Sequence, residues 1–298
     1  MKRPFPFVIA VVAAVLVSIP ATRAEPVQLA YKNIMLNGEL TVPEGGSLEN
    51  GVVLITHGSL AHHEMEIVVA VRDALAERGF ASLAISLGFN IDDRKGFYDC
   101  AVGPNTHKRH DAVDEIAAWV GWLKGRGAGR IAVMGHSAGG NQTAMYAAER
   151  LDPAVMAVIL LAPGSYNSES QAASYKNRYG KDLSAMLEQA KGMAPDALME
   201  GVPFIRCETA TVTAASFLSY YQPDGNGDTA ALAGAIAAPV LVIAGSKDNV
   251  VGDIAARFKP LEGDNLKFVM VEGADHFFLD LYMEDVADAA AEFLEARW

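Results

Sequence analysis

A serine stands at the centre of the sequence Gly-His-Ser-Ala-Gly at positions 135–139. An apolar run at 131–134 precedes this segment, and Thr143, Ala144 and Ala147 recur after it at helical spacing. A Gly-x-Ser-x-Gly sequence between a strand and a helix is typical of a nucleophile elbow, a tight turn that exposes a reactive hydroxyl. An ordinary turn is the alternative. The turn is so tight that side chains in place of the flanking glycines would collide with neighbouring backbone, which explains why glycines stand there. The strand before this segment and the helix after it therefore predict that Ser137 is a nucleophile.

A serine hydroxyl is a poor nucleophile until a base removes its proton, so the chemistry needs a histidine and a carboxylate from elsewhere. At this point the sequence resembles the α/β-hydrolase family, whose members place the acid after the next-to-last core strand and the histidine after the last. Here the apolar run at 240–244 leads to Asp248, and the run at 267–271 leads to His276. The resemblance therefore implies that His276 is the general base for Ser137 and that Asp248 orients it.

The other histidines fit the role of base less well. No strand leads into the first group, which consists of His62, His63, His107 and His110. His136 lies inside the elbow, where a histidine packs more often than it reacts. Asp275 departs from the small residue that the family usually has before its histidine. Because it is adjacent to His276 in sequence, we expect it to point away and rank Asp248 above it.

The family also places two backbone N–H groups around the oxyanion of the tetrahedral intermediate. One follows the nucleophile, which here is Ala138, and the other comes from a loop after an early strand. In the segment 56–60 that second donor is Ser59, with Leu60 as the alternative one residue on. Each such donor contributes on the order of 3 kcal/mol of transition-state stabilisation.

Strand and helix patterns alternate along the chain that must position these residues. Short apolar runs typical of strands buried on both faces occur at 52–55, 81–85, 130–134, 157–161, 240–243 and 267–271. Amphipathic helices lie between them, which indicates right-handed βαβ units. An alternating pattern from Val27 to Thr41 favours an edge hairpin. The expected fold class is α/β, with the α/β-hydrolase fold implied by the resemblance: a mostly parallel twisted sheet flanked by helices.

One segment interrupts the alternation. Residues 165–237 contain no strong buried strand but do contain helix-like stretches, such as Lys181 to Lys191. We interpret them as a helical cap inserted into a core of residues 25–164 and 238–298, above the carboxyl ends of the strands. Several tyrosines of this region could line a pocket or form the core of the cap, and both readings stay open: Tyr166, Tyr175, Tyr179, Tyr220 and Tyr221.

The first 24 residues resemble a secretory signal peptide. Lys2 and Arg3 precede an apolar run from Phe7 to Ile19, and Ala24 offers a cleavage site. The run is short for a membrane span, which needs about 20 apolar residues, and later apolar runs are shorter still. We expect an exported protein, periplasmic or secreted, without stable membrane insertion; an uncleaved N-terminal anchor is the alternative.

The chain is acidic, with a net charge of −12. Cleavage after Ala24 would remove three basic residues and leave 21 basic against 36 acidic ones, a net charge of −15. Such a surface repels phosphate backbones and anionic lipid head groups, so nucleic acid is a poor candidate partner. A neutral or cationic small-molecule substrate is easier to admit.

The two cysteines, Cys100 and Cys207, are far apart in sequence. In an oxidising compartment they could form a disulfide, because the loop after the strand at 81–85 and the cap both lie beyond the carboxyl ends of the strands. Two separate buried thiols are the alternative.

No cofactor and no metal are expected. The segment 224–228 has the alternating oxygen ligands of a calcium loop, but Thr229 replaces the glycine and Ala235 the bidentate glutamate of such a loop. We therefore interpret it as a turn.

These observations lead to one expected function. The chain is predicted to be a serine hydrolase that cleaves a carboxylic ester, less readily an amide, of a small molecule through an acyl-enzyme on Ser137. Two alternatives are an acyltransferase that uses the same three residues and an inert binding protein of the same fold. The presence of the complete set argues against the inert protein, which needs none of the three.

Overall fold

The computed structural model describes residues 23–166 and 168–298. The predicted signal peptide lies outside the described residues except for Arg23 and Ala24, which begin the first strand. Within the described part of the chain, no helix is long and apolar enough to cross a membrane.

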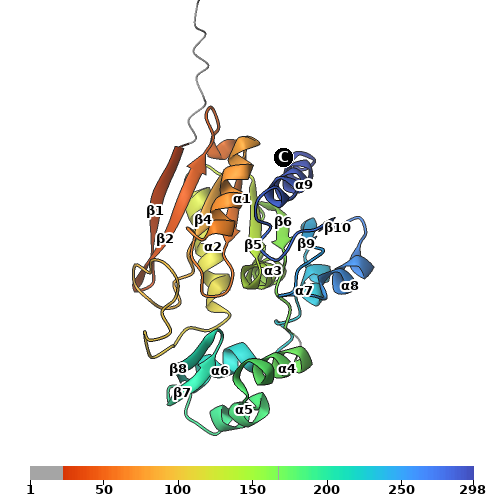
Figure 1. Ribbon diagram of the computed structural model, residues 1–298. Coiled ribbons are helices and arrows are strands. Elements are labelled where there is room, and N and C mark those ends of the chain that lie inside the picture. Colours follow the sequence, from red (N-terminus) through yellow and green to blue (C-terminus); the bar gives the residue numbers. More distant parts are fainter. Residues whose placement is uncertain (1–22, 167) are drawn as a thin grey trace, which may run out of the picture.

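An eight-stranded sheet forms the centre of the molecule, in the order β1-β2-β4-β3-β5-β6-β9-β10 (Figure 1). Its strands are β1 (Arg23–Tyr31), β2 (Ile34–Val42), β3 (Val52–Thr56), β4 (Ala81–Ile85), β5 (Ile131–His136), β6 (Val155–Leu161), β9 (Val240–Gly245) and β10 (Leu266–Val271). β2 pairs antiparallel with both β1 and β4. From β4 to β10 every pair of neighbours is parallel. The predicted mostly parallel sheet with an antiparallel edge hairpin is confirmed.

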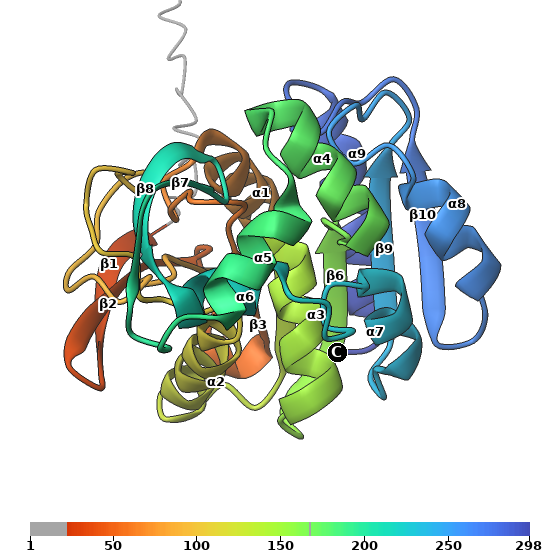
Figure 2. The same ribbon diagram turned by 90° about the horizontal axis from the view of Figure 1, so that it is seen from below.

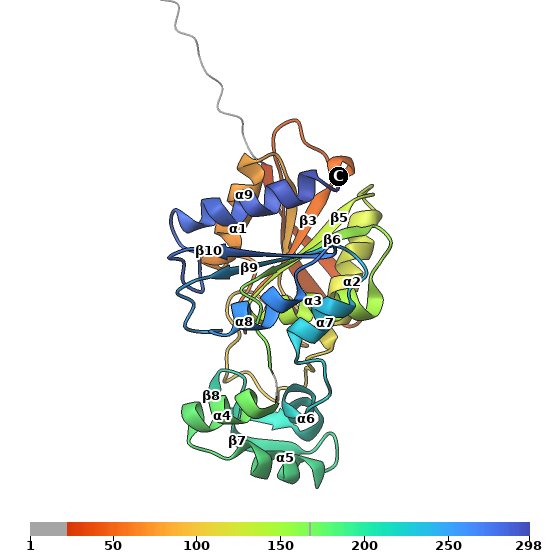
Figure 3. The same cartoon turned by 90° about the vertical axis from the view of Figure 1, so that its right-hand side faces the viewer.

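Continuous apolar sequence explains why the central strands form. Every residue of β3, β5 and β9 is buried, as expected for strands covered by helices on both faces. The helices of the core are α1 (Glu66–Glu77), α2 (Asp111–Lys124), α3 (Ala138–Arg150), α8 (Ile254–Phe258) and α9 (Tyr282–Glu295), with short 3₁₀ turns at Leu48–Asn50 and Lys259–Leu261. α1 and α9 contact each other on one face of the sheet, and α2 and α3 contact each other on the opposite face (Figure 3).

A separate lobe follows β6 and lies at the carboxyl ends of the parallel strands (Figures 1 and 3). It contains α4 (Ser168–Tyr179), α5 (Leu183–Lys191), β7 (Leu198–Phe204), β8 (Cys207–Thr213) and α6 (Ala214–Tyr221). Seen from below, these elements lie across the core (Figure 2). The chain then returns through α7 (Thr229–Ala235), which packs against α3. We call the segment 168–221 the lobe.

The lobe is not purely helical, which corrects one expectation. β7 and β8 form a two-stranded antiparallel sheet. β7 contains Gly201 in a left-handed conformation and Pro203, and its pairing register shifts on both sides of Val202. These irregularities break the period-two alternation that identifies a strand in a sequence, so the pattern was absent although the strands form.

Candidate active site

The predicted elbow joins β5 to α3 at Ser137. Ser137 has φ 57° and ψ −121°, a left-handed region that residues other than glycine rarely adopt. Hydrogen bonds hold this conformation: the Ser137 N–H donates to Leu161 O (3.0 Å), and Ser137 O accepts from the N–H groups of Gly140 (2.9 Å) and Gly164 (2.7 Å). The surrounding backbone therefore fixes the strained turn and the direction of the hydroxyl.

Three glycines make this turn sterically feasible. A Cβ at position 135 would lie 2.2 Å from Gly139 O, and one at position 139 would lie 2.3 Å from His57 O. Both contacts involve backbone atoms that cannot rotate away, as the sequence argument anticipated. A Cβ at Gly140 would also lie 2.9 Å from Pro163. The elbow pattern gave no sign of this third constraint, because it depends on the loop that follows β6.

A chain of hydrogen bonds runs from Ser137 to Asp248. Ser137 Oγ lies 2.9 Å from His276 Nε2, and His276 Nδ1 lies 2.7 Å from Asp248 Oδ2. We call these three residues the relay. Ser137 is 6% exposed and His276 is 3% exposed, so solvent competes little for these bonds. With the proton on Nδ1, this geometry allows Nε2 to accept a proton from the serine hydroxyl.

The two loops after β9 and β10 bring the acid and the histidine together. The Asp248 carboxylate accepts hydrogen bonds at Oδ1 from the N–H groups of Val250 (2.8 Å) and Val251 (2.9 Å). Burial alone would raise the pKa of Asp248, but the hydrogen bonds from His276 and from these N–H groups outweigh it and lower the pKa below its ordinary value. Asp248 is therefore an anion at neutral pH.

Asp275 lies next to His276 in sequence but takes a different place. Its side chain is exposed, and its Oδ1 accepts a hydrogen bond from the Phe277 N–H on the same turn at 2.8 Å. It belongs to the turn, whereas Asp248 contacts the ring of His276.

The remaining histidines make other contacts. His63 Nδ1 lies 2.7 Å from Ser86 Oγ, and His107 Nδ1 lies 2.9 Å from the Tyr220 hydroxyl. His136 points away from the serine hydroxyl, because its Nε2 donates to His276 O at 3.0 Å. Burial lowers the pKa of His136 to about 4 and that of His107 to about 3, so both rings stay neutral. Within the described chain, His276 is the histidine hydrogen-bonded to Ser137.

Two backbone N–H groups are available beside Ser137. Within residues 23–166 and 168–298, the N–H groups of Ser59 and Ala138 donate to no other group, and both residues line the pocket above the relay. Leu60 lines the pocket too and has φ 54°. The tight turn at 58–61, closed by a bond from Ala61 N–H to Gly58 O, presents this loop to the site.

A buried cation that sequence analysis did not find supports this loop. Arg94 donates to Ala61 O (2.8 Å) and to Leu87 O (2.7 Å) and also contacts His57 Nε2 (3.2 Å). His57 Nε2 accepts the Leu87 N–H as well, so its proton is on Nδ1, which donates to Gly58 O. Burial, together with the charge of Arg94, lowers the pKa of His57 well below its ordinary value. Arg94 could not be singled out beforehand, because its partners are backbone carbonyls of distant segments.

A pocket of about 710 Å³ lies between Ser137 and the lobe. All five tyrosines weighed above line it. Tyr175 and Tyr221 are also almost fully buried, and their rings pack together at 5.3 Å between centroids. The pocket and lobe-core interpretations therefore both hold for Tyr175 and Tyr221, which line the cavity and pack together in the core of the lobe. Three arginines that no sequence motif marks also line this pocket: Arg109, Arg178 and Arg206.

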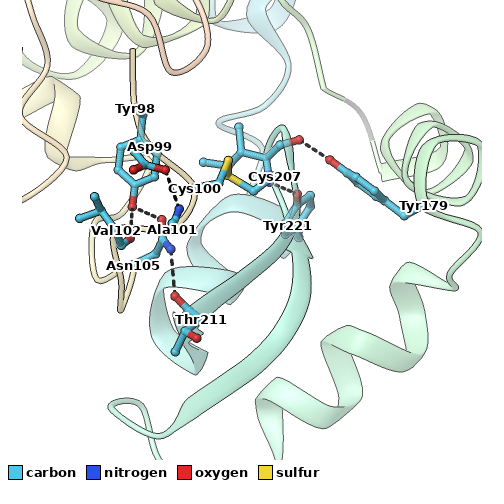
Figure 4. Close-up of a disulfide and its surroundings, with 11 residues drawn as sticks. Tyr98, Asp99, Cys100, Ala101, Val102, Asn105, Tyr179, Cys207, Thr211 and Tyr221 are labelled. Carbon is cyan, nitrogen blue, oxygen red and sulfur yellow. Dashed lines mark hydrogen bonds between the residues drawn. A yellow bond between two sulfur atoms is a disulfide. The ribbon is translucent and has the colours of Figure 1, made fainter. Parts of the chain in front are cut away.

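A disulfide joins Cys100 to Cys207 and ties the lobe to the loop after β4 (Figure 4). Beside it, Asn105 Nδ2 donates to Thr211 O at 2.9 Å, and Asn105 forms an isolated bridge with Val212 (Figure 4). The covalent and hydrogen-bonded links lie on the same side of the lobe. They connect β8 to the core independently of the chain segments before α4 and after α6.

The calcium-like segment is occupied by its own hydrogen bonds. Asp224 Oδ1 accepts from the Asn226 N–H at 2.9 Å, and Asp228 caps α7 and pairs with Arg257. Within the described residues, no group of three or more His, Cys, Asp or Glu side chains is arranged to hold a metal ion.

Comparisons with known proteins identify the family and the fold. A model of the alpha/beta hydrolase family matches residues 52–290. Among solved structures, Est1E from Butyrivibrio proteoclasticus with bound ferulic acid has a TM-score of 0.67 and 21% identity over 91% of this chain and 98% of its own. The monoacylglycerol lipase of Paleococcus ferrophilus has a TM-score of 0.59 and 20% identity over 88% of this chain and 98% of its own.

An esterase of Pyrococcus furiosus has a TM-score of 0.59 and 20% identity, over 93% of this chain and 92% of its own. At these identities the solved structures establish the fold alone. No curated protein sequence matches the chain. The family match spans the elbow, both loops of the relay and the lobe, and the chain therefore belongs to the alpha/beta hydrolase family.

Proposed function

We propose that this protein is a serine hydrolase that cleaves carboxylic esters of small molecules through an acyl-enzyme on Ser137. The observation that carries the proposal is the continuous relay from Ser137 to Asp248, with distances of 2.9 and 2.7 Å, at the floor of a pocket. A serine on a strained turn, a histidine within hydrogen-bond reach and an ionised carboxylate behind it supply the requirements of nucleophilic catalysis.

The reaction follows from these positions. Ser137 Oγ attacks the ester carbonyl carbon while His276 Nε2 takes the hydroxyl proton, and the Asp248 carboxylate stabilises the resulting imidazolium through Nδ1–H. The carbonyl oxygen becomes an oxyanion and accepts hydrogen bonds from the N–H groups of Ala138 and Ser59. His276 then gives its proton to the leaving alcohol, and the acyl group remains on Ser137.

Water completes the cycle. His276 takes a proton from a water molecule, whose oxygen attacks the acyl carbon and releases the carboxylic acid, and Ser137 regains its proton. An ester is the favoured substrate because its carbonyl is more electrophilic than that of an amide, and because an amide nitrogen leaves only after it has been protonated. Support for this class also comes from the structural neighbours, which are named as esterases and a lipase.

Export is part of the proposal. The N-terminal sequence at 1–24 resembles a signal peptide, and the Cys100–Cys207 disulfide suits an oxidising compartment outside the cytoplasm. Both features favour a periplasmic or secreted enzyme.

Labelling with a fluorophosphonate tests the proposal, because such reagents attach to activated serine hydroxyls. We expect the probe to label the wild-type protein on the peptide that contains Ser137, and Ser137→Ala to lose both labelling and turnover of 4-nitrophenyl butyrate. Ser47→Ala, which changes an exposed serine far from the pocket, is the matched control and should label fully. Labelling that persists in a folded Ser137→Ala variant would overturn the assignment.

A further inference from the structure

The pocket has a local charge opposite to that of the protein. The chain as a whole carries a net charge of −12. Among the charged residues that line the pocket, however, three are arginines, Arg109, Arg178 and Arg206, and one is an acid, Asp253. A concave site lined by cations concentrates anions even when the rest of the surface repels them.

Arg109 is the most buried of the three. It is 9% exposed and lies in the loop just before α2. Its backbone N–H donates to Ser219 Oγ at 3.0 Å, and its guanidinium donates to Tyr220 O. The guanidinium also lies 5.1 Å from the ring centroid of Tyr166. These contacts from α6 and from the segment after β6 hold the cation in the pocket wall.

No carboxylate of residues 23–166 and 168–298 lies within 4 Å of the Arg109 guanidinium. Some other arginines of this acidic protein do have such partners, for example Arg72 with Glu39 and Arg150 with Asp114. The buried Arg94 has none either, but its guanidinium donates to three backbone carbonyls, whereas that of Arg109 donates to one. A buried cation without a counter-charge is costly, since desolvation weakens its hydration and no anion compensates. An anionic group of a bound molecule would remove that cost.

Arg178 and Arg206 extend the positive wall toward solvent. Arg178 lies at the end of α4, and Arg206 lies in the turn between β7 and β8. Both side chains are exposed, and neither pairs with a carboxylate in the described part of the chain. They lead from the surface of the lobe to Arg109 and Ser137 within one cavity.

We propose that the pocket is an acceptor site for a carboxylate, so that the substrate is an ester whose acyl or alcohol part carries a free carboxylate, and that Arg109 determines this specificity. This inference rests on the proposed ester hydrolysis and adds its substrate class. It also revises the expectation of a neutral or cationic substrate, because that expectation used the net charge of the chain, whereas recognition depends on the residues around the cavity.

Matched pairs of esters test the inference. One arm compares the 4-nitrophenyl half-esters of adipic and suberic acid with the corresponding half-amides, in which a carboxamide replaces the distant carboxylate. The other arm compares the butyryl esters of 4-hydroxybenzoate and 4-hydroxybenzamide. We expect the carboxylate member to have a kcat/KM about tenfold or more higher in at least one arm, in line with a charge-assisted hydrogen bond.

Variants assign that preference to the arginines. Arg109→Gln should abolish the preference, because kcat/KM for the carboxylate member should fall about tenfold or more beyond any change for the carboxamide member. The double variant Arg178→Ala/Arg206→Ala should reduce the preference a few-fold and weaken its dependence on salt concentration. Arg126→Gln, an exposed arginine outside the pocket, is the control and should keep the full preference. If Arg109→Gln does not fold, the double variant carries the test.

The outcomes separate this inference from the proposed function. Equal or better turnover of the carboxamide members in both arms, or a preference that survives in a folded Arg109→Gln variant, overturns the carboxylate site while ester hydrolysis stands. If the wild-type protein turns over no ester and takes no fluorophosphonate label, hydrolysis fails. In that case calorimetry tests the carboxylate site by itself, with suberate titrated into the Ser137→Ala variant. Binding that disappears when Arg109→Gln is added supports the site. If suberate does not bind Ser137→Ala, the site is rejected.

Discussion

The core and the lobe face each other across one pocket, but they hold their side chains in different ways. On the core side Ser137 and His276 are buried, and the backbone around Gly135 and Gly139 leaves no space for a Cβ. On the lobe side Arg178 and Arg206 are exposed and unpaired within the described chain. The lobe contributes no strand to the eight-stranded sheet and is joined to the core by the disulfide, by the hydrogen bonds of Asn105 and by its two chain connections.

Under the proposed function, this difference assigns the chemistry to the core and the recognition of the substrate to the lobe. The relay depends on backbone positions that the central sheet fixes, so small changes there should have large effects on rate. Lobe side chains contact the pocket from a small unit with its own core of Tyr175, Phe204 and Phe217, so changes there should mainly alter which substrates fit. Substitutions on the two sides therefore test this division.

The largest expected effect is on the core side, at Asp248. Asp248→Asn should lower kcat for 4-nitrophenyl butyrate by about 10⁴-fold, because an amide no longer holds the His276 tautomer that accepts the serine proton. Asp275→Asn is the matched control, since Asp275 is exposed and bonds its own turn, and it should change kcat by no more than about twofold. A comparable loss in both variants, with unchanged melting temperatures, would contradict the assignment of Asp248.

Removing the disulfide tests the lobe side. In the chain-entropy model a crosslink between positions 107 residues apart stabilises by up to about 4 to 5 kcal/mol, so Cys100→Ala/Cys207→Ala should lower the free energy of unfolding by up to that amount. The kcat for a small ester should change little, whereas kcat/KM for a bulky ester should change more, because the lobe is held less firmly over the pocket.

Reductant provides the control for this prediction. Dithiothreitol should lower the melting temperature of the wild-type protein but not that of the double variant. Thiol counting by mass spectrometry after denaturation without reductant should find no alkylated cysteine in wild-type protein from an oxidising compartment. Two alkylated thiols would mean that the bridge does not form there.

The sequence predicts the core side of the pocket better than the side that faces the lobe. The core strands were predictable because β3, β5 and β9 are continuous apolar runs, and the elbow because its glycines stand next to Ser137 in sequence. The resemblance to the family implied that Asp248 and His276, which follow the last two strands, would meet Ser137, and the structure brings the three together. The environment of Arg109 could not, because Tyr166 and Tyr220 reach it from distant segments of the chain.

We expect the free energy of unfolding to depend on pH through Glu115, a buried residue of the core on α2. This side chain is 2% exposed, and its Oε2 accepts the Gly88 N–H at 2.7 Å. Burial raises the pKa of Glu115 to about 7 from an ordinary value of 4.5, despite that hydrogen bond and the charge of Arg94. The folded state therefore keeps a proton that the unfolded state has lost between about pH 4.5 and pH 7.

The sign of the effect follows from this proton. As pH rises through that window, ionisation favours the unfolded state, so Glu115 destabilises the fold by up to about 3 kcal/mol above pH 7. Glu115→Gln should gain stability relative to wild type by that amount between pH 4.5 and pH 7.5, measured by urea unfolding. The exposed Glu77→Gln is the control. A difference between Glu115→Gln and wild type that stays constant across the window would show that Glu115 ionises normally in the fold.

The smallest expected effect is on the lobe side, at Tyr179 on α4. Its hydroxyl donates to Ile205 O at 2.7 Å, across the pocket wall from α4 to the turn between β7 and β8 (Figure 4). Tyr179→Phe removes this bond without changing the shape of the ring. Tyr179 is only partly buried, so water can replace the hydroxyl at Ile205 O, and the free energy of unfolding should fall by about 0.5 to 1 kcal/mol. Because no atom of the relay depends on this bond, kcat for 4-nitrophenyl butyrate should remain that of the wild type, while KM for a bulky ester should shift by a few-fold. Urea unfolding and steady-state kinetics measure both quantities on the same preparation. A fall in kcat for the small ester would mean that the lobe controls the position of Ser137, and the division between a chemical core and a recognising lobe would then be wrong.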